Sequence, residues 1–446
     1  MSTVAPTPPK HESSSTWLED WDPENEEFWE SRGKAIANRT LLITTLNLVM
    51  AFAVWFVVSA LIVRMPLIGF DLSKSQLYWL AAMPGLAGGS FRLIHTFLTP
   101  KFGTRAVVTF SSASLLIPLI GWYIAIQDNS TPYGVLLVLA LLAGLGGGNF
   151  SSFMPSTSLF FPKRKAGTAL GVQAGIGNFG VSLVQFIVPW IIGFSLIGSA
   201  QATKAGGSLW LQNAVLIWIP FVVLFTVMAW FGLKSVPVQA GVREQMDIFR
   251  EKHTWTMTSL YIMTFGTFAG FAATFPVLIK TQYGGFDSPP DPLAYAFYGP
   301  LIGSIARVIA GPISDRLGGS LVTQISGLGL VVATFFSSMY VKPDASSDFT
   351  PFFWGMMAIF LFAGIGNAST FKQIPMIFST RQSAGVLGWT GAIAAYGPFI
   401  YGMLIASITA KTGSPSAMFV GVGVFCAINV AINWYSFRRP GSTIKC

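Results

Sequence analysis

The sequence predicts an all-α membrane protein with twelve transmembrane helices, arranged as two six-helix halves with both termini on the cytoplasmic side. Three observations carry this prediction. Of 446 residues, 52% are hydrophobic and only 10% are charged, whereas soluble domains carry about 25% charged residues. Apolar runs of about 20 residues, long enough to cross a bilayer, recur twelve times along the chain. Lysine and arginine gather in alternate connections between these runs.

The apolar runs are predicted to be helices, because open strands cannot satisfy their backbone hydrogen bonds in lipid. The predicted spans are 41–63, 76–98, 106–126, 134–160, 168–196, 212–233, 256–280, 293–313, 320–340, 353–378, 384–409 and 415–436. A polar cytoplasmic tail, 1–40, precedes them and lacks the pattern of a signal peptide. The longest later polar connection, 234–255, divides the chain into halves 41–233 and 256–436, and a short cytoplasmic tail, 437–446, follows.

The basic residues set the predicted orientation. With both termini inside, eighteen lysines and arginines lie in cytoplasmic segments and six lie outside, as the positive-inside rule requires. The net charge of +9 therefore reflects topology, and we expect no nucleic-acid partner. The two cysteines, Cys426 and Cys446, offer neither a disulfide framework nor a metal-site spacing. We expect no metal, no cofactor and no catalytic residue.

The two halves resemble each other. Gly148-Asn-Phe-Ser-Ser-Phe153 in span four matches Gly366-Asn-Ala-Ser-Thr-Phe371 in span ten, and Arg92 in span two matches Arg307 in span eight. A near-constant offset between such matches marks an internal duplication. Duplicated six-helix halves are typical of transporters, whose substrate site lies between the halves near the middle of the membrane.

Three basic residues, Arg92, Arg307 and Lys372, fall inside spans that contain no aspartate or glutamate. Each costs about 2.5–3.5 kcal/mol at a helix centre, so two equivalent arginines without a carboxylate partner predict a bound anion. Guanidinium supplies planar paired donors that suit an oxyanion. Snorkelling to an interface is the alternative for the arginines.

Two further residues could serve coupling. Lys372 could contribute to the field of the site or to gating, or it could face a water-filled vestibule. His95 lies one helical turn after Arg92 and could exchange a proton with passing substrate. Its alternative role is a hydrogen-bonded histidine that packs between helices.

The stretch GLGGGNFSSFMPSTSLFFPKRKAGTALGVQAGIGNFG, residues 144–180, resembles a nitrate signature of the nitrate/nitrite porter family in the major facilitator superfamily. GIGNASTFKQIPMIF, residues 364–378, resembles a second signature, and the segment from Gly311 to Gly319 resembles the superfamily loop motif. The resemblance implies a major facilitator fold in which small residues let helices pack closely. The glycines it implicates in packing or gating are Gly144, Gly146, Gly148, Gly167, Gly171, Gly175, Gly177, Gly364 and Gly366.

The same resemblance implies the substrate and its contacts. Arg92 and Arg307 would clamp nitrate or nitrite, with Asn178 hydrogen-bonding nearby. Phe150, Tyr261 and Phe265 would wall the site. The implied protein is a monomeric, multi-pass transporter of a bacterial cytoplasmic membrane, serving nitrate assimilation or respiration, with nitrate, nitrite and the lipid bilayer as its partners.

The coupling mode follows from energetics. Importing an anion against an interior-negative potential costs about 2.3 kcal/mol per 100 mV, and exchange of nitrate for nitrite avoids this cost. Because the spans lack carboxylates, we favour nitrate-in/nitrite-out exchange by alternating access. A proton-coupled nitrate or nitrite symporter is the main alternative. A carrier for another small oxyanion and an anion channel are the remaining ones.

Overall fold

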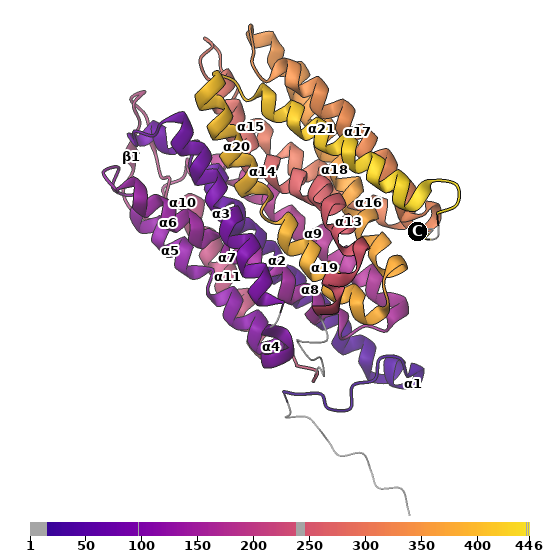
Figure 1. Ribbon diagram of the computed structural model, residues 1–446. Coiled ribbons are helices and arrows are strands. Elements are labelled where there is room, and N and C mark those ends of the chain that lie inside the picture. The colour runs from indigo at the N-terminus through magenta and orange to yellow at the C-terminus, as the bar shows by residue number, and fades with distance from the viewer. Residues whose placement is uncertain (1–15, 97, 238–245, 443, 445) are drawn as a thin grey trace, which may run out of the picture.

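The computed structural model describes residues 16–96, 98–237, 246–442, 444 and 446. Its helices run alongside one another in one bundle (Figure 1). The first half contains α1 (Glu26–Phe28), a π turn (Trp29–Gly33), α2 (Lys34–Leu61), a 3-10 turn (Met65–Ile68), α3 (Lys74–His95), α4 (Leu98–Ala113), α5 (Leu116–Ala125), α6 (Tyr133–Ala143), α7 (Leu145–Gly148), α8 (Phe150–Ser158), α9 (Lys163–Ile191), β1 (Gln201–Ala202), β2 (Ser208–Leu209), α10 (Asn213–Leu216) and α11 (Trp218–Gly232).

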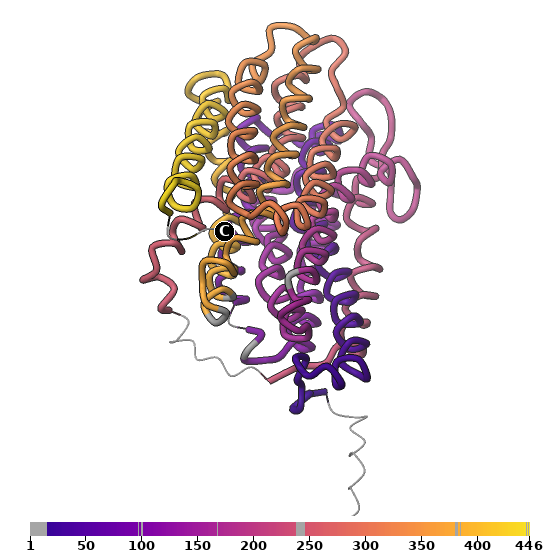
Figure 2. The backbone as a smooth tube through the Cα atoms, turned by 90° about the vertical axis from the view of Figure 1, so that its right-hand side faces the viewer, coloured from indigo at the N-terminus to yellow at the C-terminus, as the bar shows by residue number. Residues whose placement is uncertain are grey.

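The part of the sequence from Met246 onward, called the second half below, has no strand among its described residues. It contains a 3-10 turn (Met246–Arg250), α13 (Lys252–Tyr261), the π turn η4 (Ile262–Gly266), α14 (Thr267–Leu278), the π turn η5 (Ile279–Tyr283), α15 (Pro292–Ala296), α16 (Tyr298–Leu317), α17 (Gly319–Tyr340), a 3-10 turn (Ser346–Asp348), α18 (Phe349–Ile377), α19 (Thr380–Ala394), α20 (Gly397–Thr412), α21 (Ser416–Asn433) and a π turn (Trp434–Arg438). Figure 2 shows these later helices beside the earlier ones.

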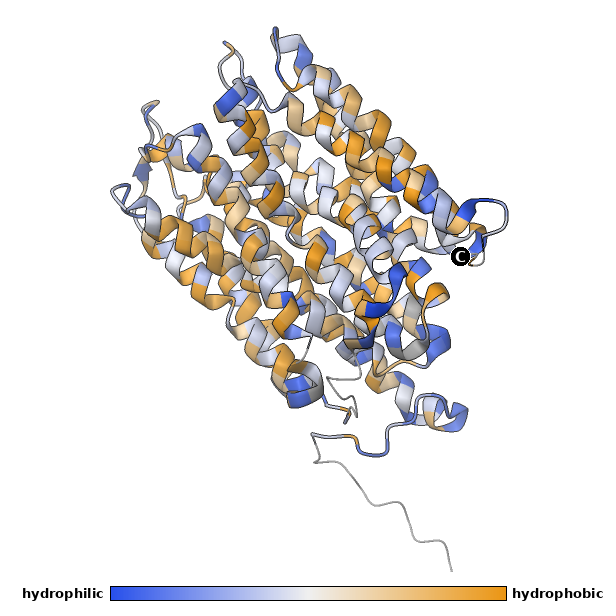
Figure 3. Cartoon of the chain, viewed as in Figure 1, coloured by the Kyte–Doolittle hydropathy of each residue, from blue (hydrophilic) through white to orange (hydrophobic). Residues whose placement is uncertain are grey.

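Eleven helical segments of the described chain are long and apolar enough to cross a membrane. They correspond to eleven of the twelve predicted spans. The segment outside this set is α3, which has 22 residues and carries Gln76, Ser90, Arg92 and His95 among its polar side chains. Hydrophobic residues cover the flanks of the bundle, and hydrophilic ones gather at its ends (Figure 3). The chain is therefore a multi-pass membrane protein.

The continuous rod from α13 to η5 lies at the centre of the bundle. In its most apolar window 94% of the residues are buried, compared with 28% in the segment Asn213–Gly232. Helices of the two halves meet around this rod, with α3 against α20 and α9 against α16. The centre is therefore where both halves can present side chains to a shared site.

An N-terminal arm fastens the end of the bundle opposite the β1–β2 hairpin (Figure 1). The indole of Trp21 donates to the carbonyl of Leu159 over 3.2 Å, and Glu24 accepts from the backbone nitrogen of Lys163. Glu26 forms an ion pair with Arg164 at 2.6 Å. The acidic arm thus covers the basic first turn of α9, and Trp21 joins the arm to the helices. Sequence analysis did not predict this docking.

Candidate anion site between the two halves

A close glycine contact lies one helical turn before each buried arginine. On α3, Gly88 precedes Arg92 by four residues, and a Cβ built on Gly144 would lie 2.8 Å from the backbone nitrogen of Gly88. On α16, Gly303 precedes Arg307 by four residues, and a Cβ on Gly364 would lie 2.1 Å from the carbonyl oxygen of Gly303. Only glycine permits these close approaches. The contacts with the neighbouring helices therefore fix where each arginine lies along the length of the bundle.

Arg92 is fully buried and held by both halves. Its Nε donates to the carbonyl of Gly147 over 2.8 Å, and its Nη1 donates to the carbonyl of Gly391 in the second half over 2.7 Å. The guanidinium carbon lies 4.5 Å from the ring centre of Phe150 and 5.1 Å from that of Phe265. Nη2 has no hydrogen-bond partner among the described residues, so one face of the fork can still bind an anion.

Arg307 is 4% exposed and lies over the ring of Phe371 at 5.4 Å. Its Nη1 has no hydrogen-bond partner among the described residues. Arg92 lies against the ring of Phe265 and Arg307 against that of Phe371, and Tyr261 stacks on both rings. The two arginines therefore flank one aromatic stack. None of the ion pairs among the described residues brings a carboxylate to either arginine.

Four aromatic rings stack beside the arginines. Tyr261 stacks on Phe265 with ring centres 5.4 Å apart and on Phe371 at 4.5 Å, and Phe150 stacks on Phe265 at 6.5 Å. Tyr261 is fully buried, and its hydroxyl forms no hydrogen bond of good geometry with the described residues. The structure thus brings together Arg92, Arg307 and these aromatic residues, which the sequence had singled out except for Phe371.

Phe371 and two backbone carbonyls are the parts that sequence analysis missed. Phe371 ends the second copy of the duplicated glycine motif, so its position in that repeat was the available signal. The carbonyls of Gly147 and Gly391 carried no such signal, because every residue has a carbonyl group. Trp55 was also missed: its ring lies 5.3 Å from Arg92, and its indole donates to the carbonyl of Pro84.

Asn178 on α9 is fully buried, and neither polar atom of its amide has a partner among the described residues. Gly175, three residues earlier, packs on Val308 of α16, since a Cβ there would lie 2.5 Å from a methyl carbon of Val308. Val308 is the neighbour of Arg307. Asn178 is therefore on the stretch of α9 that passes the second arginine.

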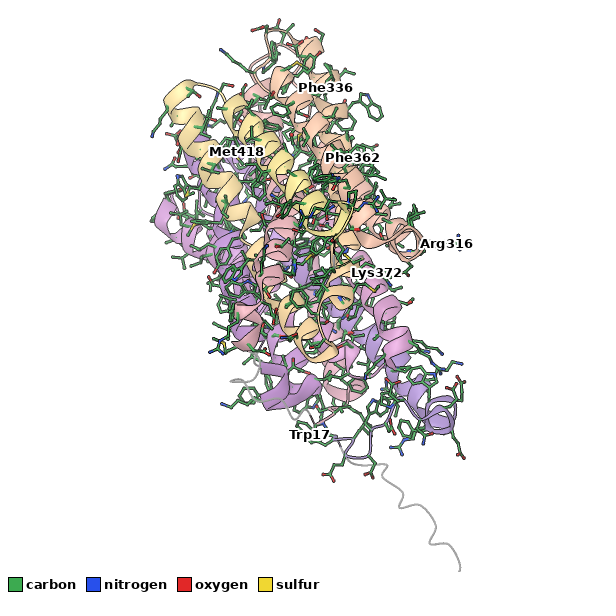
Figure 4. The ribbon with its side chains drawn as sticks, turned by 45° about the vertical axis from the view of Figure 1, so that its right-hand side comes forward. Trp17, Arg316, Phe336, Phe362, Lys372 and Met418 are labelled. Atoms are coloured by element: carbon green, nitrogen blue, oxygen red, sulfur yellow. The ribbon has the colours of Figure 1, made fainter. Side chains whose placement is uncertain are left out.

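The two residues considered for coupling have partners outside the ring stack. His95 is buried, and its Nδ1 is 2.9 Å from the hydroxyl of Ser152 on α8. Lys372 forms an ion pair with Asp315 on α16. The side chains of this pair are 41% and 56% exposed, and Figure 4 shows Lys372 on the same flank of the molecule as Arg316. A role for either residue in coupling stays a prediction.

The signature glycines fall into two groups. A Cβ would come within 3.0 Å of another residue at Gly144, Gly146, Gly148, Gly175, Gly177, Gly364 and Gly366. At Gly171 it would meet nothing within 4 Å, so no close helix contact depends on that residue in this conformation. The side-chain position of Gly167 lies outside the described residues.

The halves are joined at the end of the bundle that carries the hairpin. Arg64 binds both carboxylate oxygens of Asp291 at 2.7 Å, and the hydroxyls of Tyr78 and Thr281 are 2.7 Å apart. Nearer the centre, Gln185 donates to the carbonyl of Ala272 over 2.9 Å. These bonds close that end, and the burial of both arginines shuts the site off from solvent.

The arrangement can bind an anion reversibly and offers no covalent chemistry. No group of three or more histidine, cysteine, aspartate or glutamate side chains that could hold a metal ion occurs in the described part of the chain. The free groups beside the arginines are hydrogen-bond donors and aromatic rings. A buried, positively charged site between two helical halves is typical of a solute carrier.

Comparison with known proteins agrees with this class. The sequence model of the Major Facilitator Superfamily matches residues 43–370. The chain is 57% identical to a "Probable nitrate/nitrite antiporter NarK2" of Thermus thermophilus, over 97% of this chain and 99% of that protein. It is 36% identical to the "Nitrate/nitrite transporter NarU" of Escherichia coli (strain K12), over 96% of this chain and 98% of that protein. A "Nitrite extrusion protein" of Bacillus subtilis (strain 168) is 26% identical over 90% of this chain and 95% of its own length.

The fold and the match define a transporter of the Major Facilitator Superfamily and not an enzyme. Within that superfamily, the chain belongs to the nitrate/nitrite porter family.

Proposed function

We propose that the protein exchanges nitrate for nitrite across a bacterial cytoplasmic membrane by alternating access, with Arg92 and Arg307 clamping the anion. The observation that carries this proposal is the pair of buried arginines, one from each half, each with an unpartnered Nη atom. None of the ion pairs among the described residues involves either arginine. The relatives named as nitrate/nitrite transporters or antiporters support the choice of anion.

The architecture proposed with this function has twelve spans, with α3 as the additional one. The helix has 22 residues, enough for a length of about 33 Å at 1.5 Å per residue, and it packs among α6, α7 and α20. Among its polar residues, Arg92 lies at the candidate site, and His95 is buried against Ser152. The halves are 41–233 and 256–436, joined by 234–255, and both tails, 1–40 and 437–446, are cytoplasmic. We propose that the carrier works as a monomer.

The clamp explains why the anion drives the transport cycle. The two arginines come from different halves and flank one aromatic stack, so without a bound anion their positive charges repel. A bound monoanion offsets that repulsion and lets the halves close around it. The ligand thereby favours the closed state over the open ones, and only such differential binding can shift a conformational equilibrium. Nitrate and nitrite are planar, which suits the planar N–H donors of guanidinium. Nη2 of Arg92 and Nη1 of Arg307 have no partner among the described residues and are the donors proposed for the anion.

The proposed contacts divide between the halves. Arg92, Phe150 and Asn178 come from the first half, and Arg307, Tyr261 and Phe265 come from the second. Aromatic rings exclude water around the anion, and the low polarity strengthens the charge-assisted bonds. Rings that stack across the boundary, such as Phe150 on Phe265, separate when the halves move apart. The site is therefore complete only while the halves are together.

Exchange is favoured over proton coupling by the partners of the two titratable candidates. His95 is bonded to Ser152, and Lys372 is paired with Asp315, so neither is a free proton carrier beside the anion. Exchange also moves no net charge and avoids a cost of about 2.3 kcal/mol per 100 mV.

Counterflow in proteoliposomes tests the proposal. Vesicles loaded with nitrite should take up labelled nitrate at a rate that saturates, requires internal nitrite and ignores an imposed pH gradient. Uptake into empty vesicles that follows the pH gradient would establish symport instead. Uptake that does not saturate with nitrate would favour a channel, and stronger competition by formate or chlorate than by nitrite would indicate a carrier for another oxyanion.

A further inference from the structure

Two buried asparagines differ from all other buried asparagines of the described chain. Asn47, Asn149, Asn213, Asn429 and Asn433 each donate from Nδ2 to a carbonyl oxygen. Asn178 and Asn367 are fully buried, and neither Nδ2 nor Oδ1 of either residue has a partner among the described residues. A buried amide without a hydrogen bond costs about 1–3 kcal/mol. The two asparagines therefore have donors left for a ligand.

The register of α18 places Asn367 beside the arginine of the second half. Gly364, three residues earlier, packs on Gly303, which is one turn before Arg307 on α16. Phe371, four residues later, lies under Arg307 and stacks on Tyr261. Residues three and four apart share one face of a helix. Asn367 thus lies on the face that looks toward Arg307 and the stacked rings.

The contacts of Gly366, the residue before Asn367, show which element lies on the other side of Asn367. Gly366 packs on Thr264 of η4, since a Cβ there would lie 2.3 Å from a methyl carbon of Thr264. Thr370, four residues later on that side, also approaches Thr264, with 3.4 Å between the hydroxyls. Asn367 is consequently directed between η4, which carries Phe265, and α16, which carries Arg307.

The sequence equivalent of Asn367 in the first half already has a hydrogen-bond partner in the protein. Asn149 occupies the matching place in the duplicated motif, but its Nδ2 donates to the carbonyl of Ser111 on α4 over 3.4 Å. In the first half, the buried amide without a partner is instead that of Asn178, on α9. One unpartnered amide thus comes from each half, although the two residues are not sequence equivalents.

We propose that Asn367 donates its amide N–H to an oxygen of the bound oxyanion from the second half, opposite Asn178 in the first. This inference rests on the proposed nitrate/nitrite transport. The arginines offer the anion their unpartnered Nη atoms, and neutral amides supply further donors without adding to the repulsion between the arginines. Asn367 is then a substrate-contacting residue that contributes to the selectivity for oxyanions over spherical anions such as chloride.

Titration of the purified full-length protein with sodium nitrate tests the proposal, with Kd and Tm as readouts. Asn367→Leu removes an amide that has no partner in the protein, so its Tm without nitrate should equal or exceed that of wild type. Its Kd for nitrate should rise about 10-fold, the effect of one lost hydrogen bond to a charged group. Asn149→Leu is the matched control, with a lower Tm and a Kd within about twofold of wild type.

Asn367→Asp distinguishes a substrate-contacting residue from a purely structural one. A carboxylate beside two arginines supplies the missing counter-charge, so Tm without nitrate should rise and nitrate binding should be lost. Asn367→Ala repeats the leucine measurement with a smaller side chain, which separates poor packing from lost binding. A wild-type Kd in both Asn367→Leu and Asn367→Ala overturns the proposal. If wild type itself shows no nitrate-dependent change in Tm, the proposed function fails instead.

Discussion

Arg92 and Arg307 occupy matching places in their halves, each one turn after a glycine that touches a neighbouring helix. Their surroundings nevertheless differ. Arg92 donates to two carbonyls, one of them in the other half, and lies against the rings of Trp55, Phe150 and Phe265. Arg307 lies over one ring, that of Phe371, and its Nη1 has no partner among the described residues.

This difference shows that a duplicated residue need not keep a duplicated role. Arg92 connects the halves even without a ligand, because its bond to Gly391 crosses the boundary between them. Arg307 has fewer bonds to the protein and depends more on the anion. In the proposed clamp, the first arginine would therefore serve both structure and binding, whereas the second would serve mainly binding.

Replacing each arginine by lysine should have the largest effect and should separate these roles. In both Arg92→Lys and Arg307→Lys we expect nitrate transport to fall about 100-fold, because an ammonium group lacks the planar fork and about 3 kcal/mol of charge-assisted bonding is lost. Only Arg92→Lys should lower Tm clearly, since the buried carbonyls of Gly147 and Gly391 lose their donors. Proteoliposome uptake and thermal unfolding measure the two effects.

Equal losses of Tm in the two lysine variants would contradict the comparison. Near-normal nitrate uptake by either variant would rule out the clamp itself.

The glycine contacts beside the arginines should come next in size. Gly364→Ala places a Cβ 2.1 Å from the Gly303 carbonyl, and Gly144→Ala places one 2.5 Å from the Pro84 carbonyl. Overpacking of this kind costs about 1–3 kcal/mol or more, so both variants should lose stability and transport. Gly171→Ala, with open space around it, is the matched control. A Tm for Gly364→Ala equal to that of Gly171→Ala would show that the arginines are not positioned by these contacts.

Tyr261→Phe should have an intermediate effect. The hydroxyl is buried and has no good hydrogen bond in the described chain, so removing it should leave Tm unchanged. If the hydroxyl binds the anion, KM for nitrate should rise about 10-fold through the loss of one hydrogen bond to a charge. An unchanged KM in counterflow would exclude the hydroxyl from the site and leave the ring stack as the contribution of Tyr261.

The bond between Arg64 and Asp291 should matter least. It also joins the halves, but Asp291 is 44% exposed, and exposed ion pairs contribute about 0–1 kcal/mol. In a double-mutant cycle of Arg64→Ala and Asp291→Asn, we expect a coupling free energy of unfolding below about 1 kcal/mol. A larger coupling would mean that the hairpin end, and not Arg92, dominates the contact between the halves.

Much of the fold could be predicted because membrane helices leave a strong pattern in sequence. Long apolar runs predicted the eleven segments that are apolar enough to cross a membrane. The helix α3 was predicted as well, although its polar residues keep it out of that set. The docking of the N-terminal arm was not predicted, because it depends on tertiary contacts such as Trp21 to Leu159. The short hairpin of β1 and β2 was missed for the same reason.

The arginines were predictable because charged residues inside spans are rare and costly. Phe371 was not, because the chain has 38 phenylalanines and only the packing shows which of them stacks on Tyr261. The partner of Lys372 could not be predicted either, since Asp315 lies on another helix. Residue type thus indicated the anion, whereas the inner wall of the site required the three-dimensional arrangement.

The number of residues in the π turn η4 determines how the aromatic side chains of the site are oriented. Tyr261 directly precedes this turn and Phe265 lies within it. A π turn holds one residue more than an α turn, and each residue of a helix turns the chain by about 100°. Deleting one residue from η4 would therefore preserve a continuous helix but rotate Tyr261 away from Phe265 and Phe371. The stacking of Tyr261 with Phe265 and Phe371 thus depends on the one extra residue of the π turn.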